Sequence, residues 1–247
     1  MLNTLLLAAG KGLRITDFSK GLPKPLMPIA GDAILFRNLR WLNSFSFINS
    51  VWINLHYRHA FMKREIKNFS QDIPRLKLQF IYEKNILGTA GALKNLSSRH
   101  PKEGHNLIIY GDNLFNFDLS DFIETHFDNK NIATIALFDQ RKQIHTRIAG
   151  GKVSINDNLE IESFIEGREC ASLHYVNAGV YLLSPEITDS IPSGEFCDFG
   201  KDIFPKLLLA GIPLHGHIIN GYCLGLDAPE CFAIADELIQ QQKIILL

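Results

Sequence analysis

The chain has 247 residues, of which 46% are hydrophobic and 21% are charged, so it can bury a core and is not a disordered tail. Its 25 Lys and Arg residues nearly balance 26 Asp and Glu residues, and the net charge of -1 disfavours nucleic-acid or anionic-membrane partners. No apolar run approaches the ~18 residues that a membrane-spanning helix needs. Residues 5–9 lack the basic segment of a signal peptide, so we expect a cytoplasmic protein.

Short apolar runs alternate with segments of helical period through the first half of the chain. The expected strands are residues 2–7, 51–55, 76–82 and 107–110, and the expected helices are residues 34–45, 58–69 and 89–96. This alternation predicts parallel strands joined by right-handed crossovers. We therefore expect an α/β fold with a Rossmann-like, doubly wound, mostly parallel sheet and helices on both faces. Ligands bind such sheets at the carboxyl ends of the strands.

The second half of the chain is richer in strand-like segments. The expected strands are residues 132–138, 152–155, 161–165, 174–183, 214–218 and 222–226, with turns at 150–151 and 156–158. Helices are expected after Pro185, over 201–209 and over 229–241. Because no linker separates the halves, we expect one domain over 1–247, in which residues 116–247 form a smaller, β-rich lid on the sheet of residues 1–115.

Cysteines and histidines give weaker signals. The four cysteines form no C-x-x-C pair, so we expect reduced structural thiols. The pairs His56/His59 and His215/His217 have the spacing to share a metal, but they lack nearby Cys or acidic partners. We therefore expect polar structural roles for these histidines.

A loop of small residues follows the first strand and has the composition of a phosphate-binding loop. Its candidate residues are Leu7, Ala8, Ala9, Gly10 and Gly12, followed by Arg14. The dinucleotide motif G-x-G-x-x-G fails because its third glycine is replaced by Ile15, and no Gly-Lys pair is followed by Ser or Thr as in a Walker A loop.

Lys24 lies between Pro23 and Pro25. Two prolines stiffen the backbone, so the ammonium group can be aimed back at a phosphate held by the glycine loop. Arg14 or Lys24 taken alone is better explained as a solvated loop charge, and the glycines alone as turn residues. The combination of the glycine loop with both cations favours a polyphosphate site with Arg14 and Lys24 as catalytic residues.

Four segments together resemble one family. Residues 7–31 are similar to the G-x-G-x-R and P-K-P-L signature of the sugar-1-phosphate nucleotidylyltransferases. Residues 83–93 resemble the nucleotide-binding segment of that family, residues 110–112 its metal-binding G-D, and residues 177–181 its N-x-G-x-Y strand on the sugar side. The resemblance spans nearly the whole chain in the right order, and it implies a nucleotide-binding half over 1–115 and a sugar-binding half over 116–247.

The resemblance implies roles for further residues. It places Glu83, Gly88 and Thr89 in the nucleotide site and makes Asp112 a substrate contact and a Mg²⁺ ligand. It also implies that Glu166 and Asn177 bind sugar hydroxyls, with Arg168 as a stand-in for a lysine that contacts the sugar phosphate. A strand-end Glu and an Asn bonded to the backbone are the structural alternatives for Glu166 and Asn177.

Near the C-terminus the chain departs from the family pattern. The family has a metal-binding Asp where this chain has Gly225, and this chain has Asp227 two residues later. Residues two apart in a strand lie ~6.6 Å apart, so Asp227 reaches a metal only if the backbone shifts or through water. Asp227 is therefore a candidate second metal ligand, and its alternative role is to cap the helix that begins near Pro229.

The resemblance predicts Mg²⁺-dependent transfer of a nucleotidyl group from a nucleoside triphosphate to a sugar 1-phosphate. Residues 87–93 look most like mannose- or heptose-1-phosphate guanylyltransferases, so GTP is favoured, whereas residues 54–57 resemble an N-acetylmuramate-1-phosphate uridylyltransferase. Uridylyl or cytidylyl transfer to another sugar 1-phosphate or to phosphocholine is an alternative. Gly225 also allows a non-catalytic nucleotide-sugar-binding relative. Family members are often dimers or tetramers, so a homo-oligomer is possible.

Overall fold

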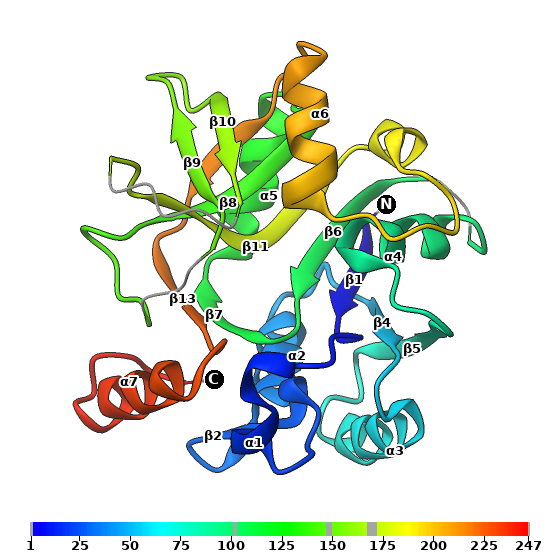
Figure 1. Ribbon diagram of the computed structural model, residues 1–247, viewed down its shortest axis with the longest axis vertical. Helices are drawn as coiled ribbons and strands as arrows, with labels where there is room; N and C mark the ends of the chain where they lie inside the picture. The colour runs from blue at the N-terminus through cyan, green and yellow to red at the C-terminus, as the bar shows by residue number, and fades with distance from the viewer. Residues whose placement is uncertain (1, 101–102, 147–149, 167–171, 247) are drawn as a thin grey trace.

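Nine strands of the described residues form one sheet in the computed structural model, which describes residues 2–100, 103–146, 150–166 and 172–246 (Figure 1). The centre of the sheet is parallel. Its four strands lie in the order β6 (His105–Tyr110), β1 (Leu2–Leu7), β4 (Ser50–Leu55) and β5 (Lys77–Tyr82). These strands coincide with the four apolar runs of the first half, and the expected α/β class is confirmed.

Strands of the second half extend the same sheet and make it mixed. β11 (Tyr175–Leu183) runs antiparallel to β6 and also pairs with β8 (Ala133–Asp139) and β9 (Lys152–Ile155). β9 forms a hairpin with β10 (Ile161–Ile165), and β12 (His215–Ile218) lies parallel to β8. The carboxamide oxygen of Asn156 accepts from the N–H groups of Asn158 and Glu160, which forms the predicted turn of this hairpin.

Helices cover both faces of the sheet because successive residues of its strands face opposite sides. Leu6 of β1 joins one apolar core, and Leu5 and Leu7 join the other. The helices of the first core are α2 (Ile34–Ser44), α3 (His59–Phe69) and α5 (Leu119–Asp128), and those of the second are α4 (Gly88–Ser97) and α6 (Phe204–Leu209). This two-sided burial explains the continuous apolar runs of the central strands.

A third core joins the beginning of the chain to its end. It packs Ile15, Met27 and Ile29 against Leu224 and Leu226, with α7 (Pro229–Gln240) alongside. In this region β13 (Gly221–Gly225) pairs with β7 (Asn113–Phe117), and β2 (Pro28–Ile29) pairs with β3 (Asp32–Ala33). The third core therefore brings the segment around Lys24 next to the segment that leads to Asp227.

Several elements differ from the sequence prediction. β7 was not predicted because only Gly111 and Asp112 separate it from β6, and α5 was missed although Asp118 caps it by accepting from the Ser120 N–H. The helix expected over 201–209 consists of a π-helical turn, η5 (Phe199–Ile203), followed by α6. The remaining short helices are η1 (Leu13–Ile15), α1 (Thr16–Ser19), η2 (Lys24–Leu26), η3 (Ser70–Asp72) and η4 (Pro185–Ser190), the last of which is the helix expected after Pro185.

The described residues include three of the four cysteines and all the helices given above. Cys197, Cys223 and Cys231 are buried free thiols, as predicted, and Cys170 lies outside the described residues. Every helix in the described part of the chain is too short or too polar to cross a bilayer.

A pair of histidines, the half-buried His105 and the fully buried His126, links the sheet to α5. One ring nitrogen of His126 lies 2.8 Å from Nδ1 of His105, and the other lies 2.8 Å from the hydroxyl of Thr134 on β8. Burial lowers the pKa of His126 to about 4, and neighbouring His105 and His215 add to this effect. His126 is therefore neutral in the folded chain at neutral pH.

This burial predicts that the fold loses stability in mild acid. The unfolded chain protonates His126 near an ordinary pKa of 6.5, but the folded chain does so only near 4, so protons favour the unfolded state as the pH falls through this window. Between pH 7.5 and pH 5 we expect the free energy of unfolding to fall by about 2 kcal/mol through this residue. Urea unfolding of His126→Gln should show a shallower pH dependence, while the exposed control His59→Gln keeps the wild-type slope. Equal slopes for all three chains would contradict this explanation.

Candidate functional site

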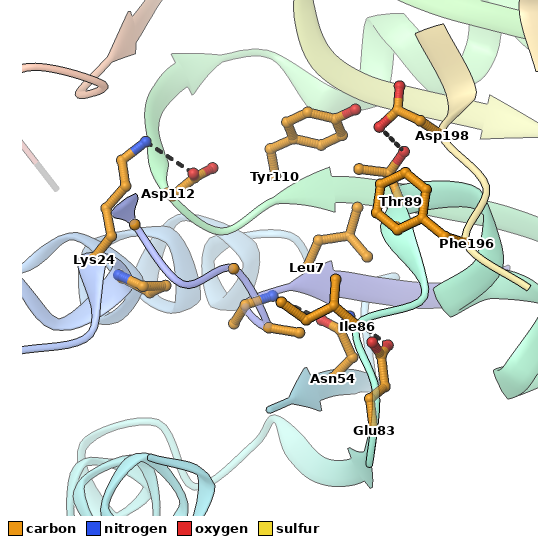
Figure 2. A pocket seen from close by; sticks show the side chains of 16 residues that line it. Leu7, Lys24, Asn54, Glu83, Ile86, Thr89, Tyr110, Asp112, Phe196 and Asp198 are labelled. Carbon is orange, nitrogen blue, oxygen red and sulfur yellow. Dashed lines mark hydrogen bonds and ion pairs between the residues drawn. The ribbon is translucent and has the colours of Figure 1, made fainter. Parts of the chain in front are cut away.

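A pocket lies at the carboxyl ends of β1, β4 and β6, the edge at which open α/β sheets bind ligands (Figure 2). Most residues selected from the sequence line it. These are Leu7, Ala8, Ala9, Gly10, Gly12, Lys24, Glu83, Gly88, Thr89 and Asp112. The other lining residues are Pro25, Asn54, Ile86, Tyr110, Phe196 and Asp198. The topology therefore brings the glycine loop, the Pro-Lys-Pro segment and the N-terminus of α4 to one place.

The loop after β1 is fixed by backbone hydrogen bonds and by its close approach to Lys24. The Ala8 N–H donates to the side-chain oxygen of Asn54 at 2.7 Å, and the Gly111 N–H donates to the Leu7 carbonyl at 2.8 Å. Gly12 has a φ of +61°, and a Cβ on it would lie 3.0 Å from Cβ of Lys24. Glycine at position 12 therefore lets the loop pass directly against the lysine.

Lys24 makes two ion pairs at one end of the pocket. Its Nζ lies 2.8 Å from Oδ2 of Asp112 and 2.6 Å from Oδ1 of Asp227, and Lys24 is only 5% exposed. Burial disfavours the charge on Lys24, but the two carboxylates outweigh this effect and raise its pKa. The three side chains form one compact charged group, and Figure 2 shows Lys24 pointing toward Asp112.

Asp227 reaches this group because the backbone leaves the strand before it. β13 ends at Gly225, which lies opposite Asn113, the residue that follows Asp112. Asp227 therefore stands beyond the strand end, and its carboxylate points back to Lys24. The helix-capping alternative is wrong, because α7 is preceded by Ala228 without any side-chain cap. Burial opposes the charge of Asp227, but Lys24 and Arg14 outweigh it and lower its pKa.

Arg14 lies at the rim of the charged group. Its Nη2 is 3.4 Å from Oδ1 of Asp227, and its side chain is 71% exposed. An exposed ion pair of this length contributes little stability, so the guanidinium can leave it for an anionic ligand. The structure thus places Arg14 next to Lys24 and Asp227, but not among the residues that line the pocket.

The opposite end of the pocket carries a buried carboxylate. Glu83 is 2% exposed, and its two oxygens accept from Nδ2 of Asn54 at 2.8 Å and from the Leu87 N–H at 3.1 Å. Burial raises the pKa of Glu83, although these hydrogen bonds oppose the shift. Asn54 was not predicted as a site residue. Its sequence signal is a polar side chain at the carboxyl end of an otherwise apolar strand.

The N-terminus of α4 is occupied by backbone from the second half of the chain. The N–H groups of Ala90 and Gly91 both donate to the Cys197 carbonyl, at 3.0 and 3.1 Å, and the Cys197 N–H donates to the Leu87 carbonyl. A Cβ on Gly88, which has a φ of +76°, would lie 2.4 Å from the same Cys197 oxygen. Gly88 is therefore required for this backbone contact, whatever ligand lies beside it.

The same segment presents Phe196 and Asp198 to the pocket (Figure 2). The Thr89 hydroxyl donates to Oδ2 of Asp198 at 2.9 Å and accepts from the Phe199 N–H at 2.9 Å. The position of Asp198 is thus set by α4. The sequence gives no periodic or motif signal for Phe196 or Asp198, because their placement depends on a contact about 110 residues away in the chain.

The predicted sugar-side residues lie behind the pocket wall. Asn177 is 7% exposed, and its Nδ2 donates to the Tyr181 hydroxyl at 2.7 Å. Glu166 is partly buried, and burial, followed by the nearby charge of Asp198, raises its pKa. Neither Glu166 nor Asn177 lines the pocket directly, and Arg168 lies outside the described residues.

The histidine pairs have other partners. Nδ1 of His56 lies 2.9 Å from the Glu83 carbonyl oxygen, and Nε2 of His217 lies 3.5 Å from a carboxylate oxygen of Asp121. Within the residues that the structure describes, no cluster of three or more His, Cys, Asp and Glu side chains is arranged to bind a metal.

Comparison with known proteins identifies relatives over nearly the whole chain. The UTP–glucose-1-phosphate uridylyltransferase of Synechocystis sp. is 31% identical over 228 residues, which cover 87% of this chain and 57% of that protein. The D-glycero-alpha-D-manno-heptose 1-phosphate guanylyltransferase of Aneurinibacillus thermoaerophilus is 27% identical over 239 residues, covering 97% of this chain and 99% of that protein. This chain spans only 50% to 62% of the length of other curated relatives.

A solved structure shares the fold. The crystal structure of HddC from Yersinia pseudotuberculosis complexed with GMP-PN matches with a TM-score of 0.78 and 25% identity, over 97% of this chain and 100% of that one. A family model for nucleotidyl transferases matches residues 3–223, a range that includes the glycine loop, Lys24, Glu83 and Asp112. The chain belongs to the nucleotidyl transferase family.

Proposed function

We propose that the chain transfers a nucleotidyl group from a nucleoside triphosphate to a sugar 1-phosphate, giving a nucleoside-diphosphate sugar and pyrophosphate. The observation that carries this proposal is the polarity of the pocket. One end holds the cation Lys24 beside a glycine loop, and the other end holds the hydrogen-bonding pair Glu83 and Asn54. A phosphate chain fits the first end and a nucleobase fits the second. Relatives named as uridylyl- and guanylyltransferases support this substrate class.

The proposed reaction needs positioning and charge neutralisation. A sugar-phosphate oxygen attacks the α-phosphorus of the triphosphate, the bond from that phosphorus to the β-phosphate breaks, and pyrophosphate leaves. The nucleophile is already anionic near neutral pH because the second pKa of a phosphate is about 6, so no general base is required. Lys24 and Arg14 counter the charge of the assembled phosphates, and N–H groups of the loop after β1 orient them.

The carboxylates of Asp112 and Asp227 fit a magnesium ion. Both lie within hydrogen-bonding distance of the ammonium group of Lys24, so the two carboxylates are close enough together to share one further cation beside it. Mg²⁺ prefers oxygen ligands and usually takes one or two carboxylates together with water and substrate phosphates. When bound, the ion would neutralise phosphate charge and polarise the α-phosphate. Asp227 thus offers the carboxylate that Gly225 cannot, which removes the main reason to favour a non-catalytic relative.

Within this function we favour GTP. Guanine presents two adjacent N–H donors, and a buried carboxylate with unused lone pairs is a matching acceptor. Each oxygen of Glu83 accepts one hydrogen bond from the protein, from Asn54 or from the Leu87 N–H, and retains a further lone pair. The complex of HddC with GMP-PN, a neighbour of this chain in fold, supports the choice of a guanine nucleotide.

The primary test is pyrophosphate release from GTP, UTP, CTP and ATP, each paired with the 1-phosphates of mannose, a heptose, glucose and N-acetylmuramate. We expect release with one nucleotide, GTP, and loss of release after EDTA that excess Mg²⁺ restores. Release with UTP or CTP instead would overturn the base assignment alone. Silence for every pair would overturn the proposed transferase activity.

The two carboxylates predict a shared metal requirement. Asp112→Asn and Asp227→Asn each remove one anionic ligand, so the Mg²⁺ concentration for half-maximal rate should rise at least tenfold in either variant. Isothermal titration of Mn²⁺ with the nucleotide-bound chain provides a readout independent of turnover. Asp236→Asn, on the exposed face of α7, is the matched control. A wild-type Mg²⁺ titration for Asp227→Asn would show that Asp227 is not a ligand.

Glu83→Gln should weaken guanine recognition. The amide replaces one acceptor oxygen by a donor that faces the guanine N–H groups, so we expect the KM for GTP to rise about 10- to 100-fold and the preference over UTP to fall. Steady-state kinetics with both nucleotides measures this ratio. Glu237→Gln on exposed α7 is the control. An unchanged ratio of kcat/KM values would contradict a base contact by Glu83.

A further inference from the structure

Asp227 lies outside regular secondary structure. β13 ends at Gly225 and α7 begins at Pro229, and Asp227 belongs to the short segment between them (Figure 1). The preceding residue, Leu226, is fully buried in the third core. The direction in which the Asp227 carboxylate points therefore depends on where the backbone leaves the last residue of β13.

A side-chain hydrogen bond fixes that last residue. The hydroxyl of Thr146 donates to the Gly225 carbonyl at 2.6 Å, and Thr146 is fully buried. Gly225 is buried as well, so water cannot replace the hydroxyl as a donor. Because a buried carbonyl without a partner is unfavourable, the end of β13 is held where Thr146 can reach it.

The segment that carries Thr146 is also bonded to the other end of β13. This segment, residues 139–146, begins at the end of β8. Nε2 of Gln143 donates to the carbonyl of Ile219, which lies just before β13. The Gln143 side chain is fixed in turn, because its oxygen accepts from the Asp139 N–H at 2.6 Å. Residues 139–146 thus fasten β13 at both of its ends.

The backbone next to Asp112 is fixed in a similar way. Asn113 lies opposite Gly225 in the pairing of β7 with β13, and its carbonyl accepts from Nδ2 of Asn38 at 2.7 Å. Asn38 is 1% exposed. Each of the two strand ends beside the carboxylates is therefore held by a buried side-chain donor, and the separation of the carboxylates is set outside the pocket.

We propose that Thr146 is a positioning residue for Asp227, and that its hydrogen bond to Gly225 sets the carboxylate at the distance from Asp112 at which both can bind one divalent cation. This assignment rests on the proposed function, in which the two carboxylates share Mg²⁺. Thr146 is not among the residues that line the pocket, so it acts through Asp227. Groups that orient metal ligands in this way strongly affect metal affinity.

Calorimetric titration with Mn²⁺ tests this assignment without turnover. The chain is first saturated with whichever of GTP, UTP, CTP and ATP it binds most tightly. Thr146→Val keeps the shape of the side chain but removes the hydroxyl, so we expect the Kd for Mn²⁺ to rise about tenfold. Thr146→Ser retains the hydroxyl, and its Kd should stay within about twofold of the wild-type value.

The matched control is Thr188→Val. Thr188 is also a buried threonine whose hydroxyl donates to a backbone carbonyl, that of Pro185 at 2.7 Å, but it lies in η4. Loss of this bond should lower thermal stability in the same way as in Thr146→Val and leave the Kd for Mn²⁺ unchanged.

A double-mutant cycle separates positioning from a general loss of structure. If Thr146 acts through Asp227, adding Thr146→Val to Asp227→Asn should not weaken Mn²⁺ binding further. A further loss of the same size would overturn this assignment, and so would wild-type Mn²⁺ affinity in a folded Thr146→Val chain. Thr146→Ala takes its place if thermal denaturation shows that Thr146→Val does not fold.

Failure of this assignment differs from failure of the proposed function. Wild-type Mn²⁺ affinity in Asp227→Asn would overturn the shared metal site and the role of Thr146 with it. A Thr146→Val effect that requires Asp227, together with no pyrophosphate release for any substrate pair, would support the role of Thr146 and overturn the transferase proposal.

Discussion

The site depends on one buried charge, the ammonium group of Lys24, held between Asp112 and Asp227. Removing an ion from water costs several kcal/mol unless paired groups replace the lost solvation. Lys24 is only 5% exposed, so its charged ammonium group can occupy this buried position only because the two carboxylates pair with it. The rigid flanking prolines and the close approach of Gly12 also hold the lysine in place, because they restrict the directions in which its side chain can point. This group of three charged side chains therefore forms one end of the pocket.

The partners of Lys24 are 88 and 203 residues away in the chain, so the charged group forms only when the whole domain has folded. Apolar packing brings them together. The third core joins Met27 and Ile29 to Leu224 and Leu226, and the pairing of β13 with β7 sets Asp112 beside the segment that carries Asp227. Hydrophobic burial thus supplies the free energy that brings the three charged side chains together. The register of the paired strands sets their positions closely enough for hydrogen bonds to form.

A second long-range contact shapes the rest of the pocket. The Cys197 carbonyl satisfies two N–H groups at the start of α4, which would otherwise remain unpaired or bind a ligand. This contact holds Phe196 and Asp198 at the pocket, where Asp198 accepts a hydrogen bond from the Thr89 hydroxyl. The pocket thereby has three parts with different chemistry: a lysine beside a glycine loop, a carboxylate with an amide, and a tyrosine hydroxyl with a carboxylate.

Local pattern determined the four central strands and the three helices between them, because a short continuous apolar run or a period of 3.6 residues is visible in a short window. It also determined that the glycine loop, Lys24, Glu83 and Asp112 meet at one edge, since parallel strands end together. Only the tertiary structure decided that Asp227 contacts Lys24 instead of capping α7, that Asn177 anchors Tyr181, and that Asn54, Tyr110 and Asp198 belong to the pocket. The reason is physical: these roles follow from where the backbone leaves a strand and from contacts across the sheet, and neither is encoded within the few residues that surround each position.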